Sequence, residues 1–259
     1  MLGGVAESIS LDAELLDDLK TAVSEACNNV VLHAYRDEVG PMKVSLYVLE
    51  DLIRVSVADA GVGLPSSDSD ERWEDRLGGV GLPVIEALAD RTRFTRSMDG
   101  GADVQMEFDA VRDGKPLFVA PPRAAADAGV QMDMPGDALV TLSPVSLVSG
   151  VLGRLARALA ATAHFSLDRF SDVYLITDAL AAHAARAASG ERVWCGLTSG
   201  ERRIEIAVGP FRAGSGDSFG TSDSRNRASA PLVLLSDQLE VETVGEDELM
   251  RVLLIDRRG

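Results

Sequence analysis

Hydrophobic residues recur at helical spacing in the first part of the chain. A helix would place on one face the positions Leu19, Ala22, Val23, Ala26 and Val30. We therefore expect a helix from about Leu11 to Tyr35, with its early acidic residues near the positive end of the helix dipole. Glu25 and Asn29 are four residues apart, so their side chains project next to each other from this helix.

Apolar and polar positions alternate after this helix, which predicts strands. The expected elements are two strands of a hairpin, a helix and two closing strands, at 42–49, 53–58, 83–90, 91–96 and 104–108. The first residues, 1–9, are short and weakly patterned and are candidates for one more strand. The stretch 66–76 is polar and charged, which is typical of a mobile loop.

The second part of the chain repeats this order of elements. The stretch 113–138 carries Pro, Ala, Gly and scattered charge without a period, so we expect a linker there. Beyond it the pattern predicts a strand, two helices, a hairpin and two closing strands, at 139–142, 148–164, 172–188, 193–198, 203–208, 239–243 and 249–256. The sequence thus predicts two domains, 1–112 and 139–259, related by tandem duplication.

The net charge of the chain indicates which classes of binding partner to expect. The chain has 259 residues and a formal net charge of -16, from 41 acidic and 25 basic side chains. Nucleic acid and anionic membranes are therefore not expected as direct partners, because their phosphates would be repelled. The two cysteines, Cys27 and Cys195, provide neither a disulfide framework nor metal-ligand spacing. The sequence shows no secretory leader and no apolar run long enough to span a bilayer, so we expect a cytoplasmic protein.

Three polar clusters fall at the ends of predicted elements, where binding sites are usually built. They are Glu25 with Asn29, the run Asp59-Ala60-Gly61-Val62-Gly63 after a strand, and Gly79-Val80-Gly81 before a helix. Glycines before a helix allow backbone N–H groups to approach phosphate oxygens. A carboxylate can accept a hydrogen bond from an amine or take a proton, and an amide oxygen can bind Mg²⁺. Each cluster alone is more often an ordinary turn, helix cap or solvated helix face.

In their order along the chain, these clusters resemble the GHKL (Bergerat-fold) ATPase superfamily, and within it the anti-sigma-factor serine kinases. The resemblance rests on 24–35, 59–63 and 79–82 and covers residues 11–108. Glu-x-x-x-Asn followed by His-Ala-Tyr is similar to this branch rather than to gyrase, chaperone or histidine-kinase relatives. The resemblance implies an α+β fold, a two-layer α/β sandwich of the GHKL type, which is here tandemly duplicated.

The resemblance also implies ATP and Mg²⁺ as cofactors and gives the matching residues roles. Glu25 is the expected general base, and Asn29 is the expected ligand of Mg²⁺ on the ATP phosphates. Asp59 is expected to bind the adenine amino group, in a pocket shaped by Gly61 and Gly63. The remaining cofactor-binding residues are expected in a lid at 66–76 and at the start of the helix after it: Arg76, Gly79, Gly81 and Leu82.

The function implied by the resemblance is an anti-sigma factor with serine protein kinase activity. Its partners would be a sigma factor and an anti-anti-sigma protein that carries the phosphorylated serine. The alternative is a binding module that sequesters a partner under the control of nucleotide, without phosphate transfer. The retained Glu25 favours the kinase, whereas Gly101-Ala102 in place of the family's Gly-Thr pair, and the altered spacing of Arg76, favour the module.

The second half keeps the predicted framework but not these motifs. Asp178 aligns with Glu25, Ala182 with Asn29, and the run 208–210 with Asp59-Ala60-Gly61. We expect a degenerate copy that does not bind ATP. Since the kinases that this chain resembles commonly form homodimers, the chain is expected to act either as a homodimer or as a pseudo-dimer, with the second half in place of a partner subunit.

Overall fold

The computed structural model describes most of the chain, namely residues 1–35, 40–62, 81–97, 100–112, 114–119, 134, 136–216 and 230–257. Contacts within the chain divide it into two compact units. The N-terminal unit spans residues 9–126, and the C-terminal unit comprises 127–259 together with residues 3–8. The boundary between Ala126 and Asp127 falls inside the stretch expected to be a linker. The first part of that stretch belongs to the N-terminal unit, where Phe118 is buried.

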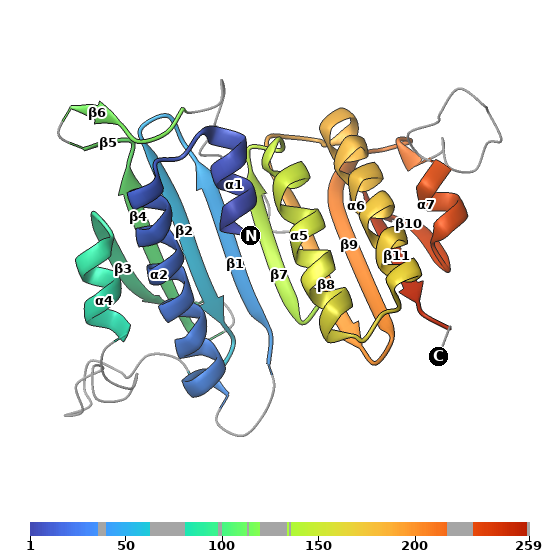
Figure 1. Ribbon diagram of the computed structural model, residues 1–259, viewed down its shortest axis with the longest axis horizontal. Helices are drawn as coiled ribbons and strands as arrows, with labels where there is room; N and C mark the ends of the chain where they lie inside the picture. Colours follow the sequence, from blue (N-terminus) through green and yellow to red (C-terminus); the bar gives the residue numbers. More distant parts are fainter. Residues whose placement is uncertain are drawn as a thin grey trace. The chain divides into compact units, whose positions relative to one another are not determined.

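The N-terminal unit is an antiparallel sheet with helices on one face (Figure 1). Its strands are ordered β1-β2-β4-β3, and its main elements are α2 (Ala13–Asn29), η1 (Val30–Ala34), β1 (Met42–Val48), β2 (Leu52–Asp59), α4 (Gly81–Leu88), β3 (Arg91–Arg96) and β4 (Ala102–Asp109). A small hairpin of β5 (Val111–Arg112) and β6 (Lys115–Pro116) follows. These elements match the strands and helices that the hydrophobic pattern predicts for this part of the chain.

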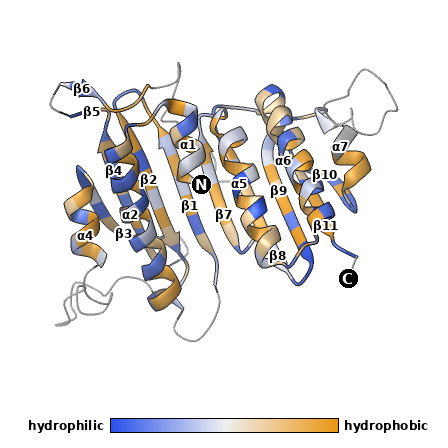
Figure 2. Ribbon diagram, viewed as in Figure 1, coloured by the Kyte–Doolittle hydropathy of each residue, from blue (hydrophilic) through white to orange (hydrophobic). Residues whose placement is uncertain are grey.

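Helix α2 forms where the apolar periodicity and a capping residue agree. The side chain of Asp12 accepts hydrogen bonds from the backbone N–H groups of Glu14 and Leu15 and so caps the helix start. The predicted apolar stripe is the buried face, with Leu15, Leu19, Ala22, Val23 and Ala26 in the core. Below it, β2 and β4 turn alternate residues inward, and Val55, Met106 and Phe108 are fully buried. The same alternation is visible in Figure 2.

The strands of the C-terminal unit are likewise antiparallel, with its helices on one face of them (Figure 1). Its strands are ordered β7-β8-β9-β11-β10, and its elements are β7 (Ala138–Ser143), α5 (Leu147–Thr162), α6 (Leu167–Ala187), β8 (Val193–Gly200), β9 (Arg203–Arg212), α7 (Ala230–Leu235), β10 (Gln238–Val244) and β11 (Asp247–Ile255). Without β7, this order is the same as the order β1-β2-β4-β3 of the N-terminal unit.

The first residues of the chain correct one expectation. Residues 2–9 form a helix, α1 (Leu2–Ile9), and not a strand. Residues 3–8 of this helix belong to the C-terminal unit, where they pack against α5. A Cβ atom on Gly4 would lie 1.8 Å from the carbonyl oxygen of Gly150, so only glycine permits this approach. Glu7 and Arg154 form an ion pair beside it. Local pattern could not reveal this helix because its partner is about 150 residues away.

The helix contact yields a stability prediction with a matched control in the same helix. Gly150→Ala should destabilise the protein by about 1–3 kcal/mol, because the new Cβ would lie 2.6 Å from the carbonyl oxygen of Gly4. Gly153→Ala should be neutral or stabilise by up to about 1 kcal/mol, because its Cβ would meet only the Thr177 hydroxyl at an ordinary 3.4 Å. Urea unfolding measures both changes. Equal effects of the two substitutions would contradict the close packing of α1 on α5.

Candidate functional site

The last turns of α2 lie against the first residue of α4. Glu25 and Asn29 are both half-buried on α2. A Cβ atom on Gly81 would lie 3.1 Å from Asn29 Oδ1 and 3.2 Å from Glu25 Oε2. The structure therefore brings together three residues from two of the predicted clusters, and a side chain at position 81 would crowd both polar groups. Leu82, the next residue, is buried in the core, where its side chain anchors the start of α4.

Asn29 has unused hydrogen-bonding capacity in this position. Its Nδ2 atom is buried and has no hydrogen-bond partner among the described residues. Buried amide groups are normally satisfied, and the two ends of an amide can exchange places by rotation about the last side-chain bond. The Asn29 side chain can therefore turn either an oxygen or an N–H group toward a ligand at the mouth of α4.

Asp59 ends strand β2 and is nearly buried, with 7% of its surface exposed. Its Oδ1 atom accepts hydrogen bonds from the backbone N–H of Gly61, at 2.8 Å, and of Ala102, at 3.3 Å. Its Oδ2 atom has no hydrogen-bond partner in the part of the chain that the structure describes. A Cβ on Gly101 would lie 2.2 Å from Oδ1, so glycine is needed beside the carboxylate. One oxygen is thus fixed by the protein, and the other remains for an external donor.

Residues that follow Asn29 hold the Asp59 loop in place. The carbonyl oxygen of Ala34 accepts a hydrogen bond from the N–H of Val62 at 3.0 Å, and a Cβ on Gly61 would lie 2.1 Å from that oxygen. The hydroxyl of Tyr35 accepts from the N–H of Ala60 at 2.8 Å and donates to the carbonyl oxygen of Pro41. Ala34 is the last residue of η1, and Tyr35 follows it. Short π-helices of this kind are often found at functional sites.

These positioning residues were not assigned a role from the sequence. The His-Ala-Tyr run after Asn29 was the available sequence signal. The helical spacing of these residues does not indicate that Tyr35 bonds to a loop 25 residues further along the chain. The glycine at position 101 was noted only because a hydroxyl-bearing residue is absent after it. In the structure, Gly101 and Ala102 both contact the Asp59 carboxylate. Gly101 leaves room for it, and the backbone N–H of Ala102 donates a hydrogen bond to it.

Several expected site residues lie outside the described residues: Gly63, Arg76, Gly79 and the lid 66–76. Within the described residues there is no group of three or more His, Cys, Asp or Glu side chains that could hold a metal ion. A nucleotide-bound Mg²⁺ takes only one or two protein oxygens beside the phosphates. Asn29 would be one of them with its amide turned so that Oδ1 faces the ligand.

In the C-terminal unit, an aromatic contact and a buried carboxylate lie at the ends of β9 and β11. Phe211, at the end of β9, is fully buried and meets the ring of His183 on α6 edge to face, with ring centroids 4.7 Å apart. Burial lowers the pKa of His183 to about 4. Glu248, at the start of β11, accepts hydrogen bonds from the backbone N–H groups of Gly214 and Gly216. Burial alone would raise the pKa of Glu248, but these N–H groups hold it below its usual range.

The buried histidine predicts how stability depends on pH. The pKa of His183 is about 4 in the folded chain against 6.5 in a model peptide, so its neutral form stabilises the fold above pH 6.5. That contribution, up to about 3 kcal/mol, is lost as the pH falls toward 4. Urea unfolding should show a smaller loss of stability between pH 7.5 and 4.5 for His183→Gln than for the unchanged chain. His164→Asn, at an exposed histidine, is the control, and an equal change in both variants would contradict the assignment.

None of the helices among the described residues is long and apolar enough to cross a membrane.

Comparison with known proteins places the site in a family. The model of the histidine kinase-like ATPase domain matches residues 1–108. The serine-protein kinase RsbW of Bacillus licheniformis is 38% identical over 116 residues, which cover 40% of this chain and 71% of that protein. The RsbW of Listeria innocua is 34% identical, covering 40% and 73%. The anti-sigma F factor of Caldanaerobacter subterraneus is 27% identical, covering 41% and 78%.

A solved structure was also found, the histidine kinase domain of a blue-light activated histidine kinase from Erythrobacter litoralis. It is 27% identical with a TM-score of 0.31 and covers 37% of this chain and 47% of that one. The sequence relatives carry the assignment, because the match to RsbW is 38% identical and spans more than two thirds of that kinase. Glu25, Asn29 and the Asp59 loop fall within residues 1–108, which match the domain model. Through its N-terminal part, this chain belongs to the family of serine-protein kinases and anti-sigma factors built on the histidine kinase-like (GHKL) ATPase domain.

Proposed function

We propose that the N-terminal unit binds Mg-ATP, transfers phosphate to a serine of an anti-anti-sigma protein, and restrains a sigma factor. Membership of the RsbW family supports the reaction and the partners. The single observation that carries the proposal is the convergence of Glu25, Asn29 and Gly81 at the mouth of α4. A base, an oxygen ligand and a helix start thereby meet at one point, as phosphoryl transfer requires.

Each residue has a physical role in this proposal. Bound Mg²⁺ neutralises charge on the phosphates, and Asn29 supplies an amide oxygen for it. Glu25 accepts the proton of the attacking serine hydroxyl. The free Oδ2 of Asp59 accepts a hydrogen bond from the adenine amino group, while its Oδ1 stays bound to Gly61 and Ala102. The backbone at the start of α4 faces the phosphates, with the helix dipole favouring the anion.

The residues outside the described part of the chain complete the proposed site. Gly79 offers a further backbone N–H group to the phosphates, Gly63 shapes the adenine pocket, and Arg76 in the lid 66–76 adds positive charge. Leu82 contributes indirectly, because its buried side chain fixes the start of α4.

A second candidate function is a nucleotide-regulated binding module that sequesters a partner without transferring phosphate. The sequence difference behind it is the alanine at position 102, which lacks the hydroxyl of the family's Gly-Thr pair. In the structure Ala102 lies at the Asp59 carboxylate, to which its N–H donates. Phosphate transfer separates the two functions: both bind ATP, but only the kinase passes its γ-phosphate to a serine.

We further propose that 1–112 and 139–259 arose by tandem duplication and that the second copy does not bind ATP. The shared strand order of the two units supports the duplication. The packed pair of Phe211 and His183, with Ala182 in place of an asparagine, supports the loss of binding. In this proposal the second copy takes the place of a partner subunit, and the chain works without a second nucleotide site.

ATP binding should depend on one atom of Asp59. Asp59→Asn keeps an acceptor for Gly61 and Ala102 but replaces Oδ2 with an N–H donor, which repels the donor on adenine. We expect Mg-ATP to raise the melting temperature of the unchanged chain and not that of the variant, with affinity at least about tenfold weaker. Asp51→Asn, at the exposed turn before β2, is the control. An unaltered shift in Asp59→Asn would remove Asp59 from the adenine pocket.

Phosphate transfer should depend on Glu25. Glu25→Gln preserves size and hydrogen bonding but removes the base, so transfer to an anti-anti-sigma protein should fall by about 10²- to 10⁴-fold while ATP binding stays within about threefold. Labelled γ-phosphate on the partner measures transfer, and calorimetry measures binding. Glu14→Gln, in the first turn of α2, is the control. Retained transfer in Glu25→Gln would exclude this residue as base; no transfer by the unchanged chain would favour the binding module.

A further inference from the structure

The peptide group between Asp59 and Ala60 is bound at both of its ends. Its N–H, from Ala60, donates to the hydroxyl of Tyr35 at 2.8 Å. Its carbonyl oxygen, from Asp59, accepts a hydrogen bond from the hydroxyl of Ser97 at 2.6 Å. A peptide group is planar, so bonds at its two ends fix the orientation of the plane. The N–H of Gly61, which donates to Asp59 Oδ1, follows directly after this plane and is placed by it.

Tyr35 reaches this peptide group from the end of η1. Its hydroxyl proton is donated to the carbonyl oxygen of Pro41, so the hydroxyl meets the N–H of Ala60 as an acceptor. A Cβ atom on Gly40 would lie 2.0 Å from Cε1 of Tyr35, so the ring lies directly against the backbone of that glycine. Loss of the hydroxyl in Tyr35→Phe would therefore remove both hydrogen bonds and keep the packing of the ring.

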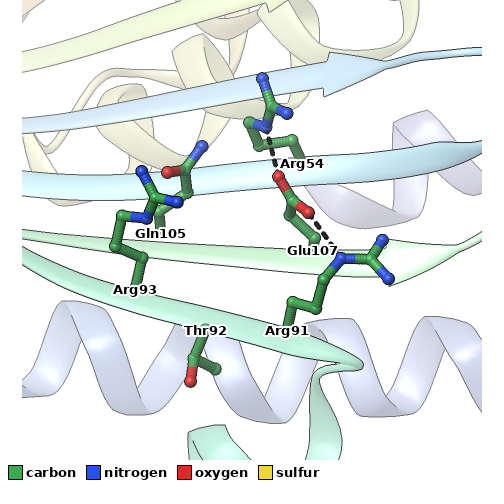
Figure 3. Close-up of a pocket in the computed structure, with 6 residues that line it drawn as sticks. All are labelled: Arg54, Arg91, Thr92, Arg93, Gln105 and Glu107. Carbon is green, nitrogen blue, oxygen red and sulfur yellow. Dashed lines mark hydrogen bonds and ion pairs between the residues drawn. The ribbon is translucent and has the colours of Figure 1, made fainter.

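Ser97 reaches the same peptide group from the turn between β3 and β4. The three strands that end at this point, β2, β3 and β4, are paired along their length. At the far end of the same ladders, Glu107 of β4 bonds to Arg54 of β2 and to Arg91 of β3, each at 2.9 Å (Figure 3). The register of the strands thus brings Ser97 beside Asp59 and does not depend on the hydroxyl of Ser97.

A fixed carboxylate at this place can read the base of a nucleotide. Adenine carries an amino group at C6, where hypoxanthine and guanine carry a carbonyl oxygen. The Oδ2 atom of Asp59, which has no hydrogen-bond partner among the described residues, would accept from the amino group and repel the carbonyl oxygen. A carboxylate that can turn away avoids this repulsion and also loses the bond to the amino group, so selectivity requires that Asp59 is held still.

We propose that the hydroxyls of Tyr35 and Ser97 are positioning groups that make the site selective for adenine over 6-oxo purines. The inference rests on the proposed nucleotide binding and adds the cause of its base selectivity. Both hydroxyls act through the peptide group that follows Asp59. Phosphate transfer occurs at Glu25, so the two hydroxyls set the KM for ATP and leave kcat unchanged.

The test uses the full chain and compares the dissociation constants of Mg-ATP and Mg-ITP by calorimetry. ITP differs from ATP in its base, which has a carbonyl oxygen in place of the amino group. The unchanged chain should bind ATP at least about tenfold more tightly than ITP. Tyr35→Phe and Ser97→Ala should each lower this ratio at least about threefold, through weaker binding of ATP, while the affinity for ITP stays within about twofold.

Matched hydroxyl deletions in the C-terminal unit are the controls. Tyr174→Phe, at an exposed tyrosine, and Ser149→Ala, at an exposed serine, should leave the ratio unchanged. A variant that is only less stable weakens the binding of both nucleotides alike, so the ratio separates positioning from stability. Phosphate transfer at saturating ATP should stay within about twofold of the unchanged chain in Tyr35→Phe and Ser97→Ala, since only ground-state binding of the base is altered.

Three results would overturn the inference while the proposed function stands, because in each of them the chain still binds ATP. The first is a ratio that neither Tyr35→Phe nor Ser97→Ala changes. The second is an equal fall of the ratio in the two controls. The third is an unchanged chain that binds ITP as tightly as ATP. If the unchanged chain bound no ATP at all, the proposed function and this inference would both be wrong.

Discussion

The carbonyl oxygen of Ala34 and the hydroxyl of Tyr35 connect the end of the first long helix to the loop after β2. Both groups bond to backbone N–H groups, so they fix the path of the loop whatever its side chains are. Gly61 approaches the Ala34 carbonyl too closely for any Cβ, which makes glycine a requirement of the contact. Asp59 is in turn held by this loop, because its Oδ1 accepts the N–H of Gly61.

Two polar groups of the N-terminal unit keep unused hydrogen-bonding capacity among the described residues. The protein binds one oxygen of Asp59 twice and leaves the other without a described partner. It buries the amide nitrogen of Asn29 without a partner, which costs about 1–3 kcal/mol unless a ligand satisfies it. Such unpaired groups are unfavourable for folding alone. For Asn29, that unpaired group lies beside Glu25 and Gly81, which is the arrangement on which the proposed site rests.

The C-terminal unit shows that the framework does not by itself create this chemistry. Its strands follow the same order, and a carboxylate again accepts backbone N–H groups from the loop after the second strand of the hairpin. There the carboxylate is Glu248, which comes from β11, and Phe211 and His183 fill the space with an aromatic contact. Two units with the same strand order thus carry different side chains, and chemistry depends on those side chains rather than on the fold.

The sequence by itself determined most elements of both units, since helical and alternating periods reflect which side chains must be buried. It also determined which polar clusters are candidates for chemistry, because Glu25 and Asn29 share a helix face and Asp59 follows a strand. Only the tertiary structure decided that Gly81 meets that face, that Tyr35 supports the Asp59 loop, and that residues 3–8 are a helix packed on α5. It also decided that arginines of β2 and β3 lie beside Glu107 of β4. These contacts join residues far apart in the chain, and local hydrophobic patterning contains no information about which distant backbone will lie opposite a given residue.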